Sequence, residues 1–474
     1  MAYLRISRHY IHTAVLLFAG AEGLLLVLAP FLGYYFRFGD WAPVSGLIIP
    51  AIVFAAVLVG SMLAMGVYES RIRDGFAGMM LRTAVAVFLL GAMATALLSY
   101  VVPTIAIGRG VLLLTTMTAF VLLALWRWLT WELLSEDVFR RRVLVLGTGP
   151  RASRIASRMR RRADQRAFRL IGFVDLGAGS AHNEVAAYDA RTLEVDGPLA
   201  DFCSDHGVHE IVVAVDERRR NQDAAGGIPL DDLMECRLRG IEVCDVQQFI
   251  EREGRKIDID LLRPSWMVFS DGFVSNGWQA RTKRTFDVAA SLLLLLVTWP
   301  IMLLAALAIW IEGRFREPVL YLQERVGLNG NLFNIMKFRS MSVDAEQAGE
   351  AVWASQNDPR ITRVGGVLRK TRIDELPQLF NVLRGDMSFV GPRPERPVFV
   401  DELNEKIPYY DQRHRVKPGI TGWAQLCYPY GASVEDAKQK LQYDLYYLKN
   451  HSLLLDLIIL LQTVEVVLVG DGAR

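Results

Sequence analysis

Apolar residues gather in four long runs in the first third of the chain. The runs cover about residues 11–36, 47–68, 79–102 and 111–131, and each is close to the roughly 20 residues that a helix needs to cross a bilayer. The first run follows a short basic segment, exceeds signal-peptide length and has no small-residue cleavage site close behind it. We therefore predict four transmembrane helices, the first of which is a retained anchor.

Positive charges at the ends of these runs predict the orientation. They precede the first run, separate the second from the third and follow the fourth: Arg5, Arg8, Arg71, Arg73, Arg140, Arg141 and Arg142. The other two loops carry one arginine each, Arg37 and Arg109. The ends that carry more arginines are therefore expected in the cytoplasm. Glu22 and Arg82 lie within apolar runs, and we expect each near a helix end or paired inside the bundle.

A fifth apolar run, residues 288–311, has Pro300 at its centre. Proline removes a helical hydrogen bond and kinks the axis. Basic residues flank the run on both sides ("RTKR" at 281–284 and "GRFR" at 313–316), so both ends are expected on the cytoplasmic side. This favours a re-entrant helix-hairpin over a kinked ordinary span. The apolar segment 453–470 carries Asp456 and Glu465, which favours a helix that lies in the membrane interface or packs on the C-terminal domain.

Between these regions the pattern changes to short apolar strands alternating with helices. "VLVLGTGPRASRIASRMRRR" predicts a strand, a glycine turn and a basic helix, and three further strands follow. Gly147, Gly149 and Ala152 match the G-x-G-x-x-A form of the dinucleotide signature, with Asp175 at about the spacing of a ribose-binding acid. Such a turn also packs a helix on a strand without any ligand. We favour a scaffold, sensor or dimerisation role for this Rossmann-like α/β domain over dinucleotide binding.

Composition agrees with several domains. The chain has 474 residues, 52% of them hydrophobic, and a formal net charge of only +2. One core does not grow to this size, and we expect no nucleic-acid partner. The four cysteines, Cys203, Cys236, Cys244 and Cys427, form no CxxC pair, which is typical of a reducing cytosol.

One stretch concentrates charge: "TRIDELPQLFNVLRGDMSFVGPRPERP", residues 371–397. Asp374 and Glu375 follow five Lys or Arg residues and no acid between Arg360 and Arg372. Helix punctuation places Asp374 at or near an N-cap, with Pro377 in the first turn and Gly385 just past the end. Such a helix start favours an ionised carboxylate or a bound phosphate. Ordinary capping by an Asp-Glu pair is the alternative.

This pair suits phosphate chemistry with a metal. One carboxylate can attack phosphorus while the other helps to hold a divalent ion, and hard oxygen ligands suit Mg²⁺, with Mn²⁺ as the alternative. The metal ligands would be Asp374 and Glu375. Cations expected to clamp a diphosphate and stabilise the leaving group are Lys337, Arg339, Arg363, Arg369, Arg372, Arg393, Arg413 and Arg415.

The motifs "KRTFD", "KFRSM", "RIDELPQLFNVLRGDMSFVGPRPERP" and "HRVKPGITGWAQ" occur between Lys283 and Gln425. With them the chain resembles the polyprenyl-phosphate hexose-1-phosphate transferases of bacterial exopolysaccharide assembly, and most of all the subgroup associated with exosortase systems. The resemblance covers essentially the whole chain. It implies a multidomain membrane protein: a four-helix transmembrane bundle at 1–135, a Rossmann-like domain at 140–262, a re-entrant hairpin at 281–312 and a mainly α catalytic domain at 313–474.

The resemblance also implies a ping-pong reaction. Asp374 would attack the sugar-side phosphorus of a UDP-sugar, form a phosphosugar-aspartyl enzyme and expel UMP, assisted by Glu375 and Mg²⁺. Polyprenyl phosphate would then accept the sugar phosphate. Arg393 matches a phosphate-contacting arginine. Asp444 matches an acid near the C-terminal "YDLYY" motif and is expected to belong to the substrate- and phosphate-binding set. Arg284 and Asp287 are expected to anchor the mouth of the hairpin. Many relatives have Ser before the hairpin proline, whereas this chain has Trp299 before Pro300.

Three other classes of function make different predictions. A nucleotide-sugar dehydratase or epimerase would need a Tyr-x-x-x-Lys pair, which the sequence lacks, so we do not expect NAD. A membrane scaffold would not need the Asp374 carboxylate. A metal-dependent glycosyltransferase could use Asp258-Ile-Asp260 and would release UDP instead of UMP.

The expected partners are a UDP-sugar, polyprenyl phosphate, membrane lipid and a second copy in a homodimer. Glucose and galactose are the favoured sugars. We expect the protein in the bacterial inner membrane, with the catalytic domain on the cytoplasmic face.

Overall fold

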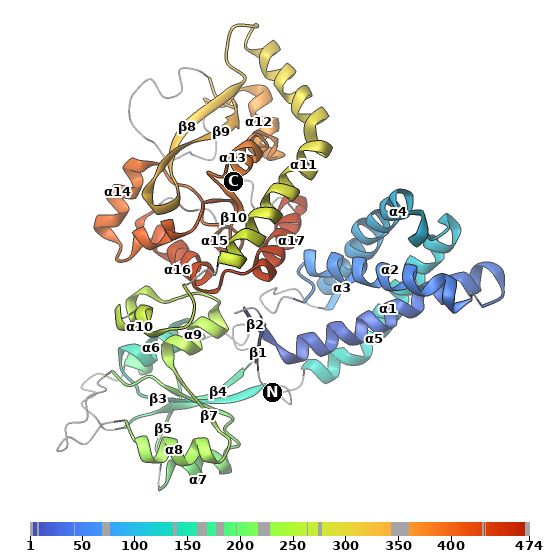
Figure 1. The fold of residues 1–474 in the computed structure, drawn as a ribbon. Helices are drawn as coiled ribbons and strands as arrows, with labels where there is room; N and C mark the ends of the chain where they lie inside the picture. Colours follow the sequence, from blue (N-terminus) through green and yellow to red (C-terminus); the bar gives the residue numbers. More distant parts are fainter. Residues whose placement is uncertain are drawn as a thin grey trace. The chain divides into compact units, whose positions relative to one another are not determined.

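The computed structural model describes residues 3–6, 9–41, 43–68, 76–135, 140–158, 168–176, 184–195, 197–216, 228–262, 264–273, 277–342, 360–428, 431 and 433–469. Arg8, Arg71 and Arg73, used above for the orientation, lie outside these ranges. The chain forms two compact units, one with most residues before 264 and the other with the residues from 264 on (Figure 1). Each unit is described separately.

The N-terminal unit begins with helices that are long and apolar enough to cross a membrane. After two short strands, these segments are α1 (Thr13–Phe38), α2 (Val44–Ala64), α3 (Phe76–Ala84) continued through a π-helical stretch (Val85–Gly91) into α4 (Ala92–Val101), and α5 (Arg109–Ser135). The two strands are β1 (Tyr3–Ile6) and β2 (His9–His12), and a 3-10 turn (Pro103–Ile105) precedes α5. Helices α1 and α5 pack along one another. The helices lie close to the four predicted runs, and the protein is a membrane protein.

A buried ion pair lies among these helices. Glu22 in α1 is fully buried, and Arg127 in α5 contacts it through Nε at 2.6 Å. The hydroxyl of Tyr68 donates to the same carboxylate at 2.5 Å. A buried charge is costly unless it is paired and hydrogen-bonded. Glu22 is paired with a residue of another apolar helix, although that partner lies 105 residues away. Arg82 is half-buried in α3.

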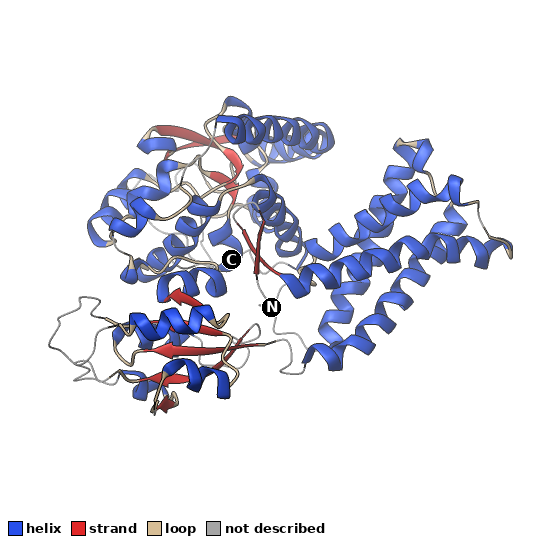
Figure 2. Ribbon diagram, turned by 60° about the horizontal axis from the view of Figure 1, so that its bottom comes forward, coloured by secondary structure: helices blue, strands red, loops and turns tan. Residues whose placement is uncertain are grey.

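The rest of the N-terminal unit is an α/β domain. Its strands form one parallel sheet in the order β5-β4-β3-β6-β7, which is the order of doubly wound domains. Helices cover both faces (Figure 2). The elements are β3 (Arg141–Leu146), α6 (Pro150–Arg158), β4 (Phe168–Val174), a 3-10 turn (Glu184–Tyr188), β5 (Thr192–Leu193), α7 (Leu199–Asp205), β6 (Glu210–Val213), α8 (Leu230–Leu238), β7 (Glu242–Asp245), α9 (Val246–Gly254) and a 3-10 turn (Ile259–Leu261).

This sheet separates two apolar cores. Alternate residues of β3 point to opposite faces: Val143 and Val145 join the core with α6 and α9, whereas Leu144 and Leu146 join the core with α7 and α8. Strands buried on both faces read as continuous apolar runs, which is why the sequence pattern predicted them. The four cysteines all lie within the described ranges, and none of them forms a disulfide bond there.

The C-terminal unit is mainly helical, with two small sheets. Its elements are α10 (Pro264–Phe269), α11 (Gly277–Glu312), β8 (Leu320–Val326), a 3-10 turn (Leu328–Gly330), β9 (Leu332–Phe338), α12 (Arg363–Lys370), a 3-10 turn (Ile373–Glu375), α13 (Gln378–Arg384), β10 (Ser388–Val390), α14 (Pro397–Lys406), a 3-10 turn (Tyr410–Arg415), β11 (Gly419–Thr421), α15 (Trp423–Cys427), α16 (Val434–Asn450) and α17 (Leu453–Val469). Strands β8 and β9 pair antiparallel, and β10 and β11 pair parallel.

Helix α11 contains the fifth apolar run. It continues without interruption through Pro300 and bends along its length in Figure 1. Its first part packs on α13, β10 and α17 and its last part on α12, while only 11% of its most apolar window is buried. Both ends are therefore attached to the C-terminal unit, and the middle is exposed. At the C-terminal end of the chain, α17 packs on the same unit.

Candidate active site

The Asp374–Glu375 dyad lies in the 3-10 turn Ile373–Glu375, between α12 and α13. Arg372, which precedes the turn, is left-handed with a φ of 59°, so the chain reverses sharply after α12. Asp374 is 7% exposed. The two carboxylates are thus carried by a tight turn at the edge of a buried region.

The sequence placed Asp374 at or near the N-cap of a helix, and this differs from the structure. The α-helix begins at Gln378, and its N-cap is Pro377. Proline has no N–H to give to a helical bond, and the chain before it forms a 3-10 turn in place of a first α-helical turn. The predicted end is correct, because Gly385 follows α13 in a left-handed conformation with a φ of 96°. The site therefore depends on side-chain cations more than on a helix dipole.

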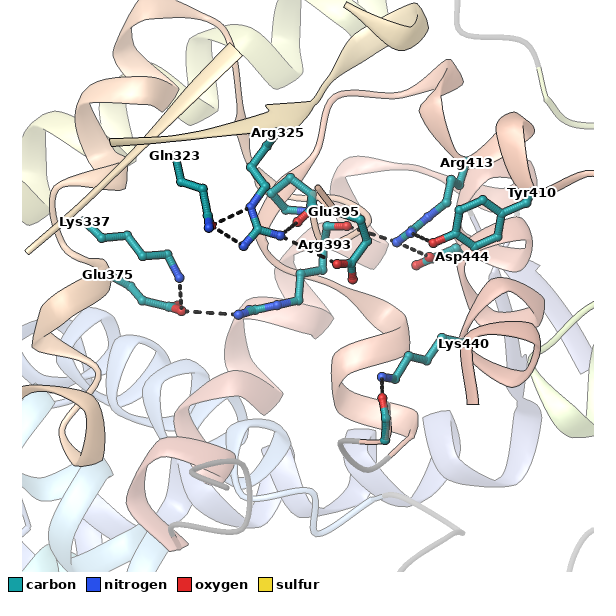
Figure 3. A network of polar contacts seen from close by, with 12 residues as sticks. Gln323, Arg325, Lys337, Glu375, Arg393, Glu395, Tyr410, Arg413, Lys440 and Asp444 are labelled. Atoms are coloured by element: carbon teal, nitrogen blue, oxygen red, sulfur yellow. Dashed lines mark hydrogen bonds and ion pairs between the residues drawn. The ribbon is translucent and has the colours of Figure 1, made fainter. Parts of the chain in front are cut away.

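Glu375 is surrounded by three cations from separate segments. Its Oε1 lies 3.2 Å from Lys337 Nζ in β9, 3.6 Å from Arg393 and 3.8 Å from Arg372. Figure 3 shows Lys337 and Arg393 both reaching the same carboxylate oxygen of Glu375. Burial alone would raise the pKa of Glu375, but Lys337, Arg393 and Arg372 outweigh it and lower the pKa to about 2. Glu375 is therefore ionised over the whole physiological range.

Asp374 is in the opposite electrostatic situation. Its Oδ1 is buried and accepts no hydrogen bond from any residue that the structure describes. Burial raises the pKa of Asp374, and the negative charge of Glu375 adds to this, against the lowering effect of Lys337, Arg372 and Arg369. A carboxylate with a raised pKa and an unsatisfied oxygen is a better nucleophile than a solvated one. The dyad thus combines an anion held by three cations with a carboxylate whose buried oxygen has no hydrogen bond in the described structure.

Backbone packing fixes the position of Arg393. The motif "GPRP" follows β10, and "KPGITGW" contains β11, its parallel partner. A Cβ on Gly391 would overlap the carbonyl oxygen of Lys417, and one on Gly422 would overlap the carbonyl oxygen of Gly391. These two motifs therefore touch through bare backbone, and their close contact leads the chain directly into Arg393.

Two further arginines hold the backbone after Gly391. Arg413 donates to the carbonyl of Arg393 at 3.0 Å and pairs with Asp444 at 2.9 Å. Arg325 donates to the carbonyl of Pro394 at 3.0 Å and lies 3.6 Å from Glu395 (Figure 3). Arg413 and Asp444, predicted to contact substrate, are instead buried together, so their observed contacts position Arg393.

The sequence did not assign a role to Arg325, Glu395 or Tyr410, whose hydroxyl accepts from Arg413 at 2.6 Å. Glu395 stands two positions after Arg393 in the quoted stretch 371–397, whereas Arg325 and Tyr410 lie outside the motifs quoted above. Burial raises the pKa of Asp444 to about 6 against the opposing charge of Arg413.

The remaining predicted cations lie in different surroundings. Arg369 is close enough to lower the pKa of Asp374, after larger effects from burial, Glu375, Lys337 and Arg372. Arg339 is buried and ion-paired with Glu317. Arg363 and Arg415 are exposed, and no described contact brings them to the dyad. The structure thus gathers Lys337, Arg369, Arg372 and Arg393 around the carboxylates.

The first turns of α11 are bonded to the same region. Arg284 donates to the carbonyls of Val382 and Leu383 at 2.5 and 2.6 Å, at the end of α13. Asp287 accepts from Ser388 Oγ at 3.1 Å and from the N–H of Phe389 at 3.2 Å. Lysine and arginine near a helix C-terminus satisfy its free carbonyls. The helix that carries Pro300 is therefore bonded to α13, which follows the dyad, and to β10, which leads into Arg393.

The dyad offers oxygen donors to a divalent cation. No group of three or more His, Cys, Asp or Glu side chains suited to a metal occurs within the described ranges. The unsatisfied Oδ1 of Asp374 and the ionised Glu375 nevertheless fit Mg²⁺, which commonly takes one or two carboxylates and completes its shell with water and substrate phosphate. In the N-terminal unit, Gly147 and Gly149 lie in the turn between β3 and α6.

Comparison with known proteins agrees with this site. The family model of the bacterial sugar transferases matches residues 278–470, which include the dyad and all its cations. The UDP-glucose:undecaprenyl-phosphate glucose-1-phosphate transferase of Caulobacter vibrioides is 45% identical over 193 residues, which are 40% of this chain and 71% of that protein. The chain belongs to the bacterial sugar transferase family. A second model, that of a CoA-binding domain, matches residues 63–222.

Two other relatives match a larger share of this chain. The undecaprenyl-phosphate glucose phosphotransferase of Komagataeibacter xylinus is 36% identical over 332 residues, 69% of this chain and 58% of that protein. The UDP-N-acetylgalactosamine-undecaprenyl-phosphate N-acetylgalactosaminephosphotransferase of Aeromonas hydrophila is 43% identical over 242 residues, 51% of this chain and 56% of that protein. The matches thus span little more than half the length of these two relatives.

Proposed function

We propose that this protein transfers a hexose 1-phosphate from a UDP-sugar to polyprenyl phosphate, and that Asp374 is the nucleophile. The observation that carries the proposal is the contrast within the dyad: Asp374 has a buried oxygen with no hydrogen bond in the described structure, and Glu375 has three cations. The names of the relatives, which act on undecaprenyl phosphate, support the substrate class.

The reaction proceeds in two displacements. Oδ1 of Asp374 attacks the phosphorus that carries the sugar and forms a P–O bond with it. The bond from this phosphorus to the bridging oxygen of the diphosphate breaks. UMP leaves with the electron pair. An oxygen of polyprenyl phosphate then attacks the same phosphorus, and the Asp374 carboxylate leaves. The product is polyprenyl-diphosphate-sugar, the first lipid-linked unit of a glycan.

The cations around Glu375 are suited to the charge that moves during the first step. Negative charge shifts from Asp374 to the departing UMP, and fixed positive groups stabilise such a change best when they need not reorganise. Lys337, Arg372 and Arg393 are already held by Glu375. Asp374 and Glu375 would hold Mg²⁺, which would supply neutralisation of phosphate charge.

The position of α11 gives the site access to a lipid. Its exposed middle is apolar, with Leu293, Leu296 and Leu304 between 64% and 71% exposed, and both ends pack on the C-terminal unit. A helix that crossed the whole bilayer would carry its two ends to opposite sides, so attachment of both ends to one unit supports a re-entrant path. The dyad would then face the lipid phosphates from the cytoplasmic side of the inner membrane.

The experiment is to incubate the purified chain with undecaprenyl phosphate, Mg²⁺ and a panel of UDP-glucose, UDP-galactose and UDP-N-acetylgalactosamine. Each donor carries a radioactive label on its sugar-side phosphate. We expect release of UMP, and without acceptor a labelled protein whose bond to phosphate is labile to hydroxylamine, as an acyl phosphate is. Release of UDP, or turnover without labelled protein, would overturn the proposal.

The rival metal-dependent glycosyltransferase has no support from its candidate motif. Asp258 is fully buried and accepts from the N–H of Asp260 at 3.2 Å, while Asp260 pairs with Arg154 at 2.9 Å. These acids close a 3-10 turn in the α/β domain. Both acids are therefore occupied by contacts within that domain. The same experiment tests the rival function, because a metal-dependent glycosyltransferase would release UDP instead of UMP.

A further inference from the structure

The turn between β3 and α6 carries the one dinucleotide signature noted in the sequence, and the CoA-binding family model covers it. In dinucleotide-binding domains the second glycine of this signature lets a pyrophosphate approach the helix start without a side chain in the way. The contacts of Gly147 and Gly149 test whether a pyrophosphate fits here.

Gly147 is required by the fold itself. Its φ is +118°, and a Cβ there would come within 2.7 Å of the carbonyl oxygen of Ala214 in the neighbouring strand segment. The N–H of Gly147 also donates to the carbonyl of Val174 at 2.9 Å. This glycine allows two strand ends to meet and gives no information about a ligand.

Gly149 faces a side chain of the protein. A Cβ on Gly149 would overlap Oδ2 of Asp216, which follows the end of β6. Oδ1 of the same carboxylate accepts from the N–H of Arg151, in the first turn of α6, at 3.2 Å, and lies 4.0 Å from the Arg151 guanidinium. A carboxylate from another strand therefore occupies the space above the glycine and satisfies a helix N–H.

A second acid reinforces this arrangement. Ser153 in α6 donates to Glu184 at 3.1 Å. Burial raises the pKa of Asp216, and the charge of Glu184 adds to that rise, against Arg151. A diphosphate entering this turn would meet two carboxylates, and Pro150 at the helix start has no N–H to offer it.

We propose that Asp216 is a built-in substitute for the phosphate of a cofactor, so that the α/β domain of this chain does not bind CoA or a dinucleotide at the β3–α6 turn. Gly149 makes room for the chain's own carboxylate. The domain keeps the architecture of a nucleotide-binding domain and uses it as a scaffold.

A double-mutant cycle on the full chain tests this, with hydrogen–deuterium exchange of α6 as the readout. Gly149→Ala should speed exchange in α6 about tenfold, because the methyl group displaces the carboxylate. In an Asp216→Ala background the same change should add less than about threefold, because the space is already empty. Asp175→Ala, at the end of the neighbouring strand, is the matched control, in which the full effect of Gly149→Ala should persist.

The cycle and a ligand arm can each overturn the inference. Equal effects of Gly149→Ala with and without Asp216 would show that Gly149 does not serve the carboxylate. CoA and NAD are added to the wild-type chain at millimolar concentration, and we expect unchanged exchange in α6. Slower exchange with either would contradict the inference, and this arm needs no variant. Both arms are independent of UMP release, so they can fail while the proposed transfer reaction holds.

Discussion

Asp374 and Asp216 are two aspartates beside short helical segments, and their surroundings differ in one respect. Asp216 accepts from the N–H of Arg151 and fills the space above Gly149. Asp374 has an arginine-rich neighbourhood, but the nearest cations contact Glu375, and its own Oδ1 accepts no hydrogen bond in the described part of the chain. One carboxylate completes a fold, and the other is left available for a substrate.

The difference shows how a reactive acid can be kept beside cations without being neutralised by them. Glu375 takes the direct contacts, while Asp374 experiences the same cations from farther away together with burial and a neighbouring negative charge. A buried polar atom without a partner costs free energy, and such costs are concentrated at functional sites. Neither oxygen of Asp216 is among the buried side-chain atoms that lack a hydrogen bond in the described structure.

The largest expected effect separates the two aspartates directly. Asp374→Asn should lower UMP release by at least about 10³-fold, because an amide cannot form the phosphosugar intermediate. Asp216→Asn keeps the size of its side chain and should leave UMP release within about twofold, since its contacts lie in the α/β domain. Both rates are measured at saturating UDP-sugar. Comparable losses in the two variants would remove the distinction between them.

Arg393 should give the next largest effect. Arg393→Ala removes one of three cations at Glu375 and should lower kcat/KM on the order of 10²-fold, as losses of single transition-state donors do. Arg393→Lys keeps the charge and should recover part of that loss. Exposed Arg415, changed to Ala, serves as the control for a general loss of positive charge. Equal losses at both arginines would mean that bulk charge, and not position, matters.

The smallest expected effect is the change in activity per unit of pH. Asp374 must be ionised to attack, and its pKa is raised above its ordinary value by burial and by Glu375. Activity should therefore fall about tenfold per pH unit below an acid limb that lies above the ordinary aspartate value of roughly 3.9. Glu375, with its pKa at about 2, adds no second limb in that range. A limb at or below the ordinary value would contradict the role of burial.

Patterns within short segments made much of the fold predictable. Apolar runs gave the ranges of the long helices, and continuous apolar strands such as Val143–Leu146 indicated a sheet covered on both faces. The dyad and its four neighbouring cations, Lys337, Arg369, Arg372 and Arg393, were visible because they stand in charged stretches of the sequence. Local chemistry is sufficient for features of this kind.

Contacts between distant segments could not be read from the sequence. Arg413 looked like a phosphate clamp but is paired with Asp444 and bonded to the backbone of Arg393. Glu22 finds Arg127 across 105 residues. The N-cap of α13 was predicted at or near Asp374 but is Pro377, three residues later, for a local reason, since Pro377 permits either a first helical turn or a cap. Pairing and backbone turns of this kind are decided by packing.

The glycines of "GPRP" and "KPGITGW" have a consequence for how this chain can vary. Because Gly391 abuts Lys417 and Gly422 through backbone atoms, neither segment can accept a methyl group at the contact, whatever happens at its neighbours. The two stretches therefore pack as one rigid unit. The direction of Arg393, which follows this contact, depends on Lys417 and Gly422, which lie much further along the chain.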